Sequence, residues 1–116
     1  MFPKFTVVSP HNLLPIVCTR RRWRHVTRHP EMRGQEDVVK RVLTDPDEIY
    51  QSNSDPNRQL FYRPSELPPP QNLGYVRVVV DYHAGTTGAV ITALHVDKPK
   101  SKDVLLWSRG MQPLLP

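Results

Sequence analysis

Prolines spread along the whole chain limit the length of helix that it can form. Thirteen of the 116 residues are proline, about twice the usual share of ~5%. Proline lacks a backbone donor and clashes with the preceding turn, so it ends helices and interrupts interior strands. This content argues against a long-helix bundle and a coiled coil, and the length argues for one domain. No apolar run approaches the ~20 residues that a membrane-spanning helix needs.

The cysteine content and the N-terminal sequence favour the cytoplasm. Cys18 is the single cysteine, so an internal disulfide cannot form, and no Cys/His spacing typical of zinc sites is present. The first 25 residues lack a charged segment followed by an uninterrupted apolar core, which a signal peptide would have. We therefore expect a cytoplasmic protein that needs no metal and no cofactor.

The first half of the chain is predicted to hold a strand and two helices. Residues 14–18 read as a strand, after which Thr19 offers an N-cap hydroxyl. A short helix is expected from there to His29, because Pro30 forces the residue before it out of the helical region. A second helix is expected from near Gly34 to the Asp-Pro-Asp sequence at 45–47. Its predicted buried stripe is Val38, Val39, Val42 and Leu43.

The second half of the chain is predicted to form strands. The clearest are residues 58–63, 75–82 and 88–96, with shorter candidates at 5–8, 48–51 and 104–107. Alternation in the strand 75–82 assigns Val76, Val78, Val80 and Tyr82 to the core, and Tyr75, Arg77, Val79 and Asp81 to the opposite face. Since the helices precede the strands, an α+β structure is expected, with the helices on one face of an antiparallel sheet of three or four strands.

The basic residues of the chain are concentrated near the first helix. The formal net charge is +5, and five of the 16 Lys and Arg residues are Arg20, Arg21, Arg22, Arg24 and Arg28. Such a cluster creates a local field that attracts phosphates. On one helix over 20–29, Arg21, Arg22, His25, Arg28 and His29 would project within an arc of about 120°. His25 and His29 would then be neighbours four residues apart.

Histidine and arginine together match the needs of RNA cleavage without a metal. Histidine can act as acid or base near neutral pH, and arginine binds phosphate oxygens without losing its charge. Arg58, Tyr62, Arg63 and Thr92 on the predicted strands are further polar groups that could project near His25 and His29. The alternative is that the histidines have ordinary packing or capping roles, the arginines are solvated, and the strand residues form cross-strand pairs. His95 and Lys98, at the end of the last hairpin arm, suggest no role by themselves.

Three short sequences carry a resemblance to a known nuclease superfamily. They are Trp23-x-His25, Arg28-His29-Pro30-Glu31-Met32 and Asp45-Pro46-Asp47-Glu48-Ile49. In this order, and followed by the strands RQLFYR, YVRVVVDY and AVITALHV and the pair Leu106-Trp107, they resemble small phage and bacterial proteins of the barnase–EndoU–colicin–RelE-like nuclease superfamily. The resemblance covers roughly residues 14–107.

The resemblance implies two N-terminal helices packed on a curved antiparallel sheet of about four strands, formed by a single nuclease-like domain over residues 14–107. Residues 1–13 would be an N-terminal arm and 108–116 a flexible tail. Many members of the superfamily are metal-independent ribonucleases, often toxins. By position, His25 and His29 would supply the acid/base pair, and Arg58, Tyr62 and Thr92 would line the cleft.

These observations predict a metal-independent, toxin- or phage-related ribonuclease that leaves a 2′,3′-cyclic phosphate. The expected catalytic residues are His25, His29, Tyr62 and Thr92. The expected phosphate-binding residues are Arg21, Arg22, Arg28, Arg58, Arg77 and Lys98. The alternative is a catalytically inactive module of the same fold that binds nucleic acid or a protein. The expected partners are RNA and, in a third hypothesis, an antitoxin or immunity protein.

Overall fold

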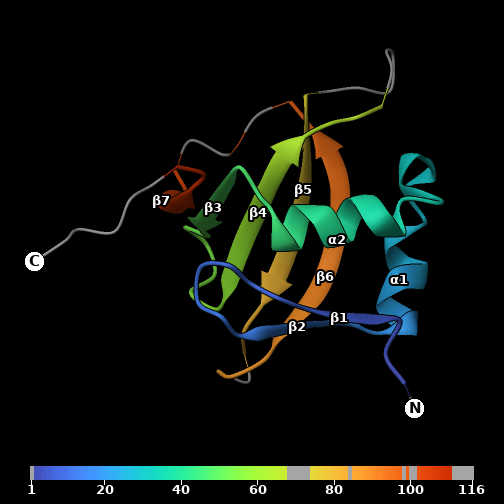
Figure 1. Ribbon diagram of the computed structural model, residues 1–116, viewed down its shortest axis with the longest axis horizontal. Helices are drawn as coiled ribbons and strands as arrows, with labels where there is room; N and C mark the ends of the chain where they lie inside the picture. Colours follow the sequence, from blue (N-terminus) through green and yellow to red (C-terminus); the bar gives the residue numbers. More distant parts are fainter. Residues whose placement is uncertain (1, 68–73, 84, 98, 100–101, 111–116) are drawn as a thin grey trace, which may run out of the picture.

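The computed structural model describes residues 2–67, 74–83, 85–97, 99 and 102–110, and within them one sheet carries two α-helices on one face (Figure 1). The strands are β1 (Phe5–Val8), β2 (Pro15–Cys18), β3 (Glu48–Gln51), β4 (Arg58–Pro64), β5 (Tyr75–Asp81), β6 (Gly88–Val96) and β7 (Val104–Ser108). The helices are α1 (Arg20–Val26), the single 3₁₀ turn η1 (Pro30–Met32) and α2 (Glu36–Thr44).

The sheet has seven strands in the order β1-β2-β6-β5-β4-β3-β7. All neighbouring pairs are antiparallel except β2 and β6, which are parallel. The α+β class is confirmed, but the expected antiparallel sheet of about four strands is wrong. Strands β1, β2 and β3 have four residues each. Short hairpins pair β1 with β2 and β3 with β4, whereas β2 pairs with β6 and β3 pairs with β7 across long stretches of chain. Local patterns do not reveal such pairings.

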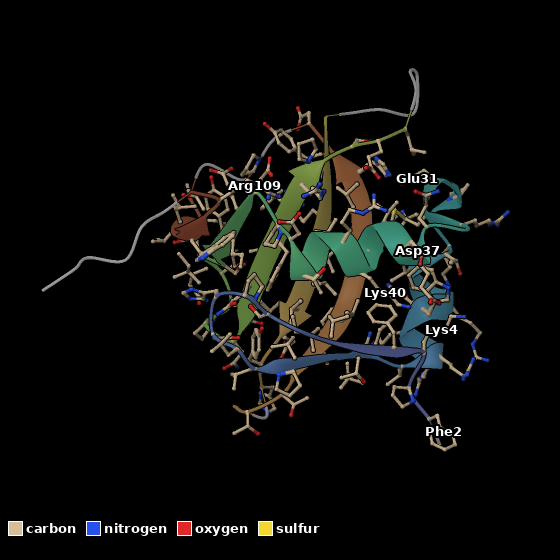
Figure 2. The ribbon with its side chains drawn as sticks, viewed as in Figure 1. Phe2, Lys4, Glu31, Asp37, Lys40 and Arg109 are labelled. Carbon is tan, nitrogen blue, oxygen red and sulfur yellow. The ribbon has the colours of Figure 1, made fainter. Side chains whose placement is uncertain are left out.

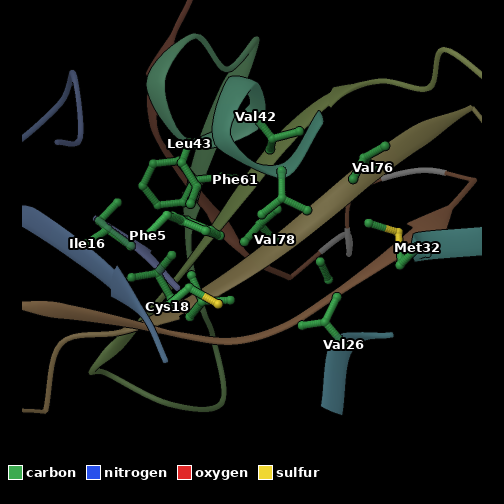
Figure 3. Packing of buried hydrophobic residues seen from close by; sticks show 14 of the residues in the cluster. Phe5, Ile16, Cys18, Val26, Met32, Val42, Leu43, Phe61, Val76 and Val78 are labelled. Atoms are coloured by element: carbon green, nitrogen blue, oxygen red, sulfur yellow. The ribbon is translucent and has the colours of Figure 1, made fainter. Parts of the chain in front are cut away.

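The core lies between the sheet and the helices (Figure 3). On β5, Val76, Val78 and Val80 are fully buried, whereas the residues between them are only half-buried. This confirms the predicted alternation of the strand. Phe61 of β4 lies opposite Val78, and both belong to one cluster with the α2 stripe, whose buried residues are Val39, Val42 and Leu43.

Helix α1 is shorter than predicted. The Thr19 hydroxyl accepts a hydrogen bond from the backbone N–H of Arg22 at 3.1 Å, so the predicted N-cap is confirmed. The helix ends at Val26 and not at His29. The backbone of His29 is extended, with φ −78° and ψ 111°, because the proline that follows excludes the helical region. His25 and His29 are therefore not four residues apart on one helix.

Two apolar side chains hold α1 on the rest of the protein. Val26 is fully buried in the core cluster. The ring of Trp23 packs edge-on against Phe5 of β1, with 6.3 Å between the ring centroids. A seven-residue helix is unstable in isolation, so these contacts fix both its existence and the direction of its exposed side.

Strand β1 lies within residues 1–13, the predicted N-terminal arm, and pairs with β2 along its whole length. Residues 111–116 of the predicted tail lie outside the described residues. In the described part of the chain, neither helix has the length or the apolar composition for crossing a bilayer.

The substitution Gly88→Ala tests the packing where β2 meets β6. An added Cβ would lie 2.6 Å from a methyl of Val80 and 2.9 Å from the Tyr82 ring. Since Val80 is fully buried, it cannot move freely, and we expect a loss of about 1–3 kcal/mol in the free energy of unfolding. Urea denaturation measures this loss.

The neighbouring exposed substitution Ala89→Ser is the control, expected to change stability by less than about 0.5 kcal/mol. Equal unfolding midpoints for the two variants would contradict the described packing of Gly88.

Candidate functional site

The exposed side of α1 and the turn after it form a cationic surface. We call it the arginine surface, and its side chains are Arg21, Arg22, Arg24, His25 and Arg28. Together with Thr19 they border a hollow of about 570 Å³. Three of the arginines lie on α1 itself and Arg28 lies in the turn just beyond its end, so four guanidinium groups are placed within one short stretch of chain.

These arginines have no partner within the part of the chain that the structure describes. Neither Arg20 nor any arginine of the arginine surface makes a side-chain hydrogen bond or ion pair there. No acidic residue lies in the first turn of α1. Positive charge at a helix N-terminus is unfavourable, because the partial charge of the helix dipole there is also positive. Helix stability therefore does not explain the arginines in this turn.

The other described arginines all have partners. Arg41, Arg58, Arg63 and Arg109 form ion pairs with carboxylates, Arg33 donates to a backbone carbonyl, and Arg77 donates to a tyrosine hydroxyl. The described arginines without any hydrogen-bond or ion-pair partner are thus confined to α1 and the turn after it.

A compact ion-pair cluster near β7 illustrates the contrast. Arg109 contacts Asp45 at 2.7 Å and Asp47 at 3.0 Å, and Arg63 contacts Asp45 at 3.2 Å. The hydrogen bond from Arg109 lowers the pKa of the Asp45 carboxyl, so this carboxylate stays ionised. Arg109 lies across the molecule from α1 (Figure 2). The charges at this end of the sheet compensate each other.

The strand residues predicted for the site lie on the other face of the sheet. Arg77 of β5 pairs with Tyr62 of β4, and Thr92 of β6 pairs with Val79. Along their strands, these paired residues alternate with residues of the core cluster, so their side chains point away from the helices. Among the described residues, Tyr62 and Thr92 therefore do not share one cleft with His25 and His29, contrary to what the resemblance implied.

Interactions within that face already engage two of these side chains. Tyr62 is fully buried, and its ring contacts the rings of Tyr50 and Tyr75 edge-on. Arg77 donates from Nε to the Tyr62 hydroxyl at 2.9 Å, with its guanidinium 5.4 Å from the centre of the Tyr62 ring. Tyr62 therefore cannot touch a substrate in this conformation.

Arg58 is likewise engaged on this face. Its Nε lies 3.4 Å from a carboxylate oxygen of Asp55 and 3.3 Å from one of Asp81. These two acids compensate the charge that was expected to hold phosphate. Lys98, also expected to hold phosphate, lies outside the described residues.

The two histidines of the predicted acid/base pair lie near α1. His25 is exposed and borders the hollow of the arginine surface. His29 is half-buried and precedes η1. Neither imidazole has a hydrogen-bond partner among the described residues, so no second group is seen to set its tautomer or orient it.

A different histidine is buried, one for which the sequence suggests no role. His95 is 6% exposed and lies opposite Val76 on the core side of β6. Its Nδ1 is 3.0 Å from the Ser65 hydroxyl, while Nε2 has no partner among the described residues. Burial lowers the pKa of His95, which favours the neutral imidazole. The alternation of the strand places His95 on the same side as Ala93, which the structure shows to be the buried side.

The arginine surface is suited to binding more than to catalysis. The hollow is bordered by the long side chains of one helix and its flanks, and not by two packed elements that exclude water. Efficient general acid/base catalysis uses positioned groups in a site from which water is excluded. Guanidinium groups on an open surface bind phosphates without such an enclosure.

The described residues give little support for a metal site or for a cysteine nucleophile. They contain no group of three or more His, Cys, Asp or Glu side chains that could hold a metal ion. Burial raises the pKa of Cys18 to about 11, so its thiol stays protonated and is a poor nucleophile. Comparison with family models, curated proteins and solved structures finds no match to this chain.

The lowered pKa of His95 predicts how stability depends on pH. In the unfolded chain histidine titrates near pH 6.5, whereas the folded protein takes up the proton only at a lower pH. Between these two values the unfolded state binds more protons, so stability falls as the pH is lowered. We expect wild type to lose more stability than His95→Gln between about pH 7.5 and 5.

Urea unfolding across this pH range measures the loss of stability in each protein. The titration of the carboxylates contributes equally to both proteins, so it cancels in the comparison. His83→Gln, at an exposed histidine, is the control and should follow wild type. Parallel curves for wild type and His95→Gln would show that His95 is not buried in the neutral form.

Proposed function

We propose that the protein binds RNA through its arginine surface, which contacts the phosphate backbone. The observation that carries this proposal is the absence of partners for the arginines of α1, where the other described arginines are paired. Unpaired guanidinium groups this close together in the chain repel each other, and an array of phosphates neutralises them. The proposal corresponds to the binding-module alternative of the sequence analysis.

The choice of RNA among polyanions draws on the sequence resemblance to a superfamily rich in ribonucleases. The geometry supports the binding step of such a protein more directly than a cutting step. Binding to phosphates places the ligand along α1 and needs neither Tyr62 nor Arg58, whose partners lie within the sheet face.

Neutralising the arginine surface is expected to weaken RNA binding. The triple substitution Arg21→Gln, Arg24→Gln and Arg28→Gln reduces the net charge from +5 to +2, that is 5 − 3 = 2. We expect affinity for a labelled single-stranded RNA to fall about tenfold or more. The slope of log K against log salt should become shallower by about 2, since each lost phosphate contact on a single strand contributes about 0.7. Fluorescence anisotropy measures both.

The matched control carries Arg41→Gln, Lys102→Gln and Arg109→Gln, which remove the same charge from exposed positions away from α1. It should retain most of the affinity and the salt slope. If the two triple variants lose the same amount of RNA affinity, binding depends only on the net charge of the protein, which contradicts a defined interface on α1.

Cleavage of the bound RNA is a second candidate function, favoured by the position of His25 at the hollow of the arginine surface. In this reaction a histidine takes the proton of a 2′-hydroxyl. The 2′-oxygen then bonds to phosphorus, and the bond to the 5′-oxygen breaks as that oxygen gains a proton. Arg22 and Arg28 would hold the phosphate. The product is a 2′,3′-cyclic phosphate, and no metal takes part.

Incubating RNA with the protein in EDTA tests this candidate. If cleavage occurs through His25, the variant His25→Ala should be slower by a factor on the order of 10² to 10⁴, and His25→Ala with His29→Ala slower still. His83→Ala, at an exposed histidine away from α1, should cleave like wild type. Absence of cleavage by wild type, or equal cleavage by all variants, would leave RNA binding as the function.

A further inference from the structure

A second hollow, partly apolar, adjoins the arginine surface. Its volume is about 720 Å³, with Phe2, Pro3 and Val17 on its apolar side and Arg20, Arg21 and Arg24 on its charged side. We call it the Phe2 hollow. Arg21 and Arg24 border both hollows, so a ligand on the arginine surface lies directly beside the Phe2 hollow.

The Phe2 ring lies open at the edge of this hollow. It is 86% exposed, and Figure 2 shows it beyond the start of β1, clear of the rest of the fold. Exposed aromatic rings are not unusual by themselves. The informative feature is the combination of an uncovered ring with three guanidinium groups that have no partners in the described chain.

We propose that the Phe2 hollow takes an unpaired nucleobase of single-stranded RNA whose phosphates lie on the arginine surface. The inference rests on the proposed RNA binding and adds which form of RNA is bound. Aromatic rings and arginine planes are the side chains on which bases stack. A base in a duplex is already stacked and paired, so it cannot enter the hollow without first leaving its partner.

Charge and shape favour a nucleobase over a lipid surface. Stable attachment to a membrane needs a broad apolar face or two anchoring signals. The other large exposed apolar side chains of the described residues are Val8, Leu13, Val104 and Leu105. Val8 and Leu13 lie at the end of the β1–β2 hairpin away from α1, and the other two lie on β7 at the far edge of the sheet (Figure 1). A single aromatic ring beside several guanidinium groups fits a single nucleobase whose neighbouring phosphates contact those groups.

The substitution Phe2→Ala tests the proposal by anisotropy with a labelled RNA, used as a single strand and as a duplex with its complement. We expect Phe2→Ala to weaken single-strand binding about fivefold or more, the lower end of what stacking of one base contributes. Duplex binding should be unchanged. Phe2→Tyr keeps the ring and should bind the single strand like wild type, and so should the control Val104→Ala, at an exposed apolar position on β7.

The remaining outcomes separate this proposal from the one on which it rests. If the triple arginine variant loses RNA but Phe2→Ala binds like wild type, the nucleobase site is wrong and RNA binding stands. Equal weakening of single strand and duplex by Phe2→Ala also overturns it. If wild type binds no RNA, both the proposed function and the proposed nucleobase site are wrong. If Phe2→Ala instead releases the protein from vesicles of phosphatidylcholine and phosphatidylserine, with RNA binding unchanged, the hollow serves a lipid surface.

Discussion

The alternation of β5 is the constraint on which the rest of the structure depends. This strand is the middle one of seven, and Val76, Val78 and Val80 bury their side chains beneath the helices. Because strand side chains alternate with a period of two, the same register sends Arg77 to the opposite face. The pairing of β4 with β5 then places Tyr62 beside Arg77. Burial of the valines therefore places these polar residues on the face away from the helices, where they cannot share a site with the exposed side of α1.

Helix α1 divides its residues in a similar way. Val26 and Trp23 pack inward, and the arginine surface is what remains outside. The helix is too short to form without those contacts, and the arginines of its first turn oppose the helix dipole. The packing of two apolar side chains thus keeps several mutually repelling charges in place, which is an arrangement that a bound polyanion would stabilise.

The sequence was sufficient for features that depend on local pattern. The 3.6-residue stripe predicted the buried side of α2, the alternation predicted the core side of β5, and Thr19 was recognised as an N-cap. Features set by distant pairing were missed. The pairings of β2 with β6 and of β3 with β7 join segments far apart in the chain, and the residues of these short strands do not specify them.

The placement of the predicted site residues on different faces could not be foreseen for the same physical reason. Grouping His25 with Tyr62 required knowledge of which sheet face the helices cover, and helical and strand periodicity each leave this undetermined. Full burial of Tyr62 follows from its neighbours Tyr50 and Tyr75 on adjacent strands, which only the register brings together. The burial of His95 next to Ser65 joins residues 30 apart in sequence. By contrast, the clustering of arginines near residue 20 is local in the sequence, and the structure keeps these side chains together at one hollow.

The distribution of charge explains why position matters more than the net value of +5. Near β7, Asp45 and Asp47 compensate Arg63 and Arg109, so that end of the sheet offers little attraction to an anion. At physiological ionic strength the field of a charge decays over about 8 Å, and the arginine surface therefore acts only on what lies close to α1. If the protein binds RNA as proposed, a long polyanion would be held at this helix, beside the Phe2 hollow, and not along the sheet. Charge and apolar surface thus meet at one place in the fold, and this coincidence makes a defined interface a better explanation of the arginines than general solubility.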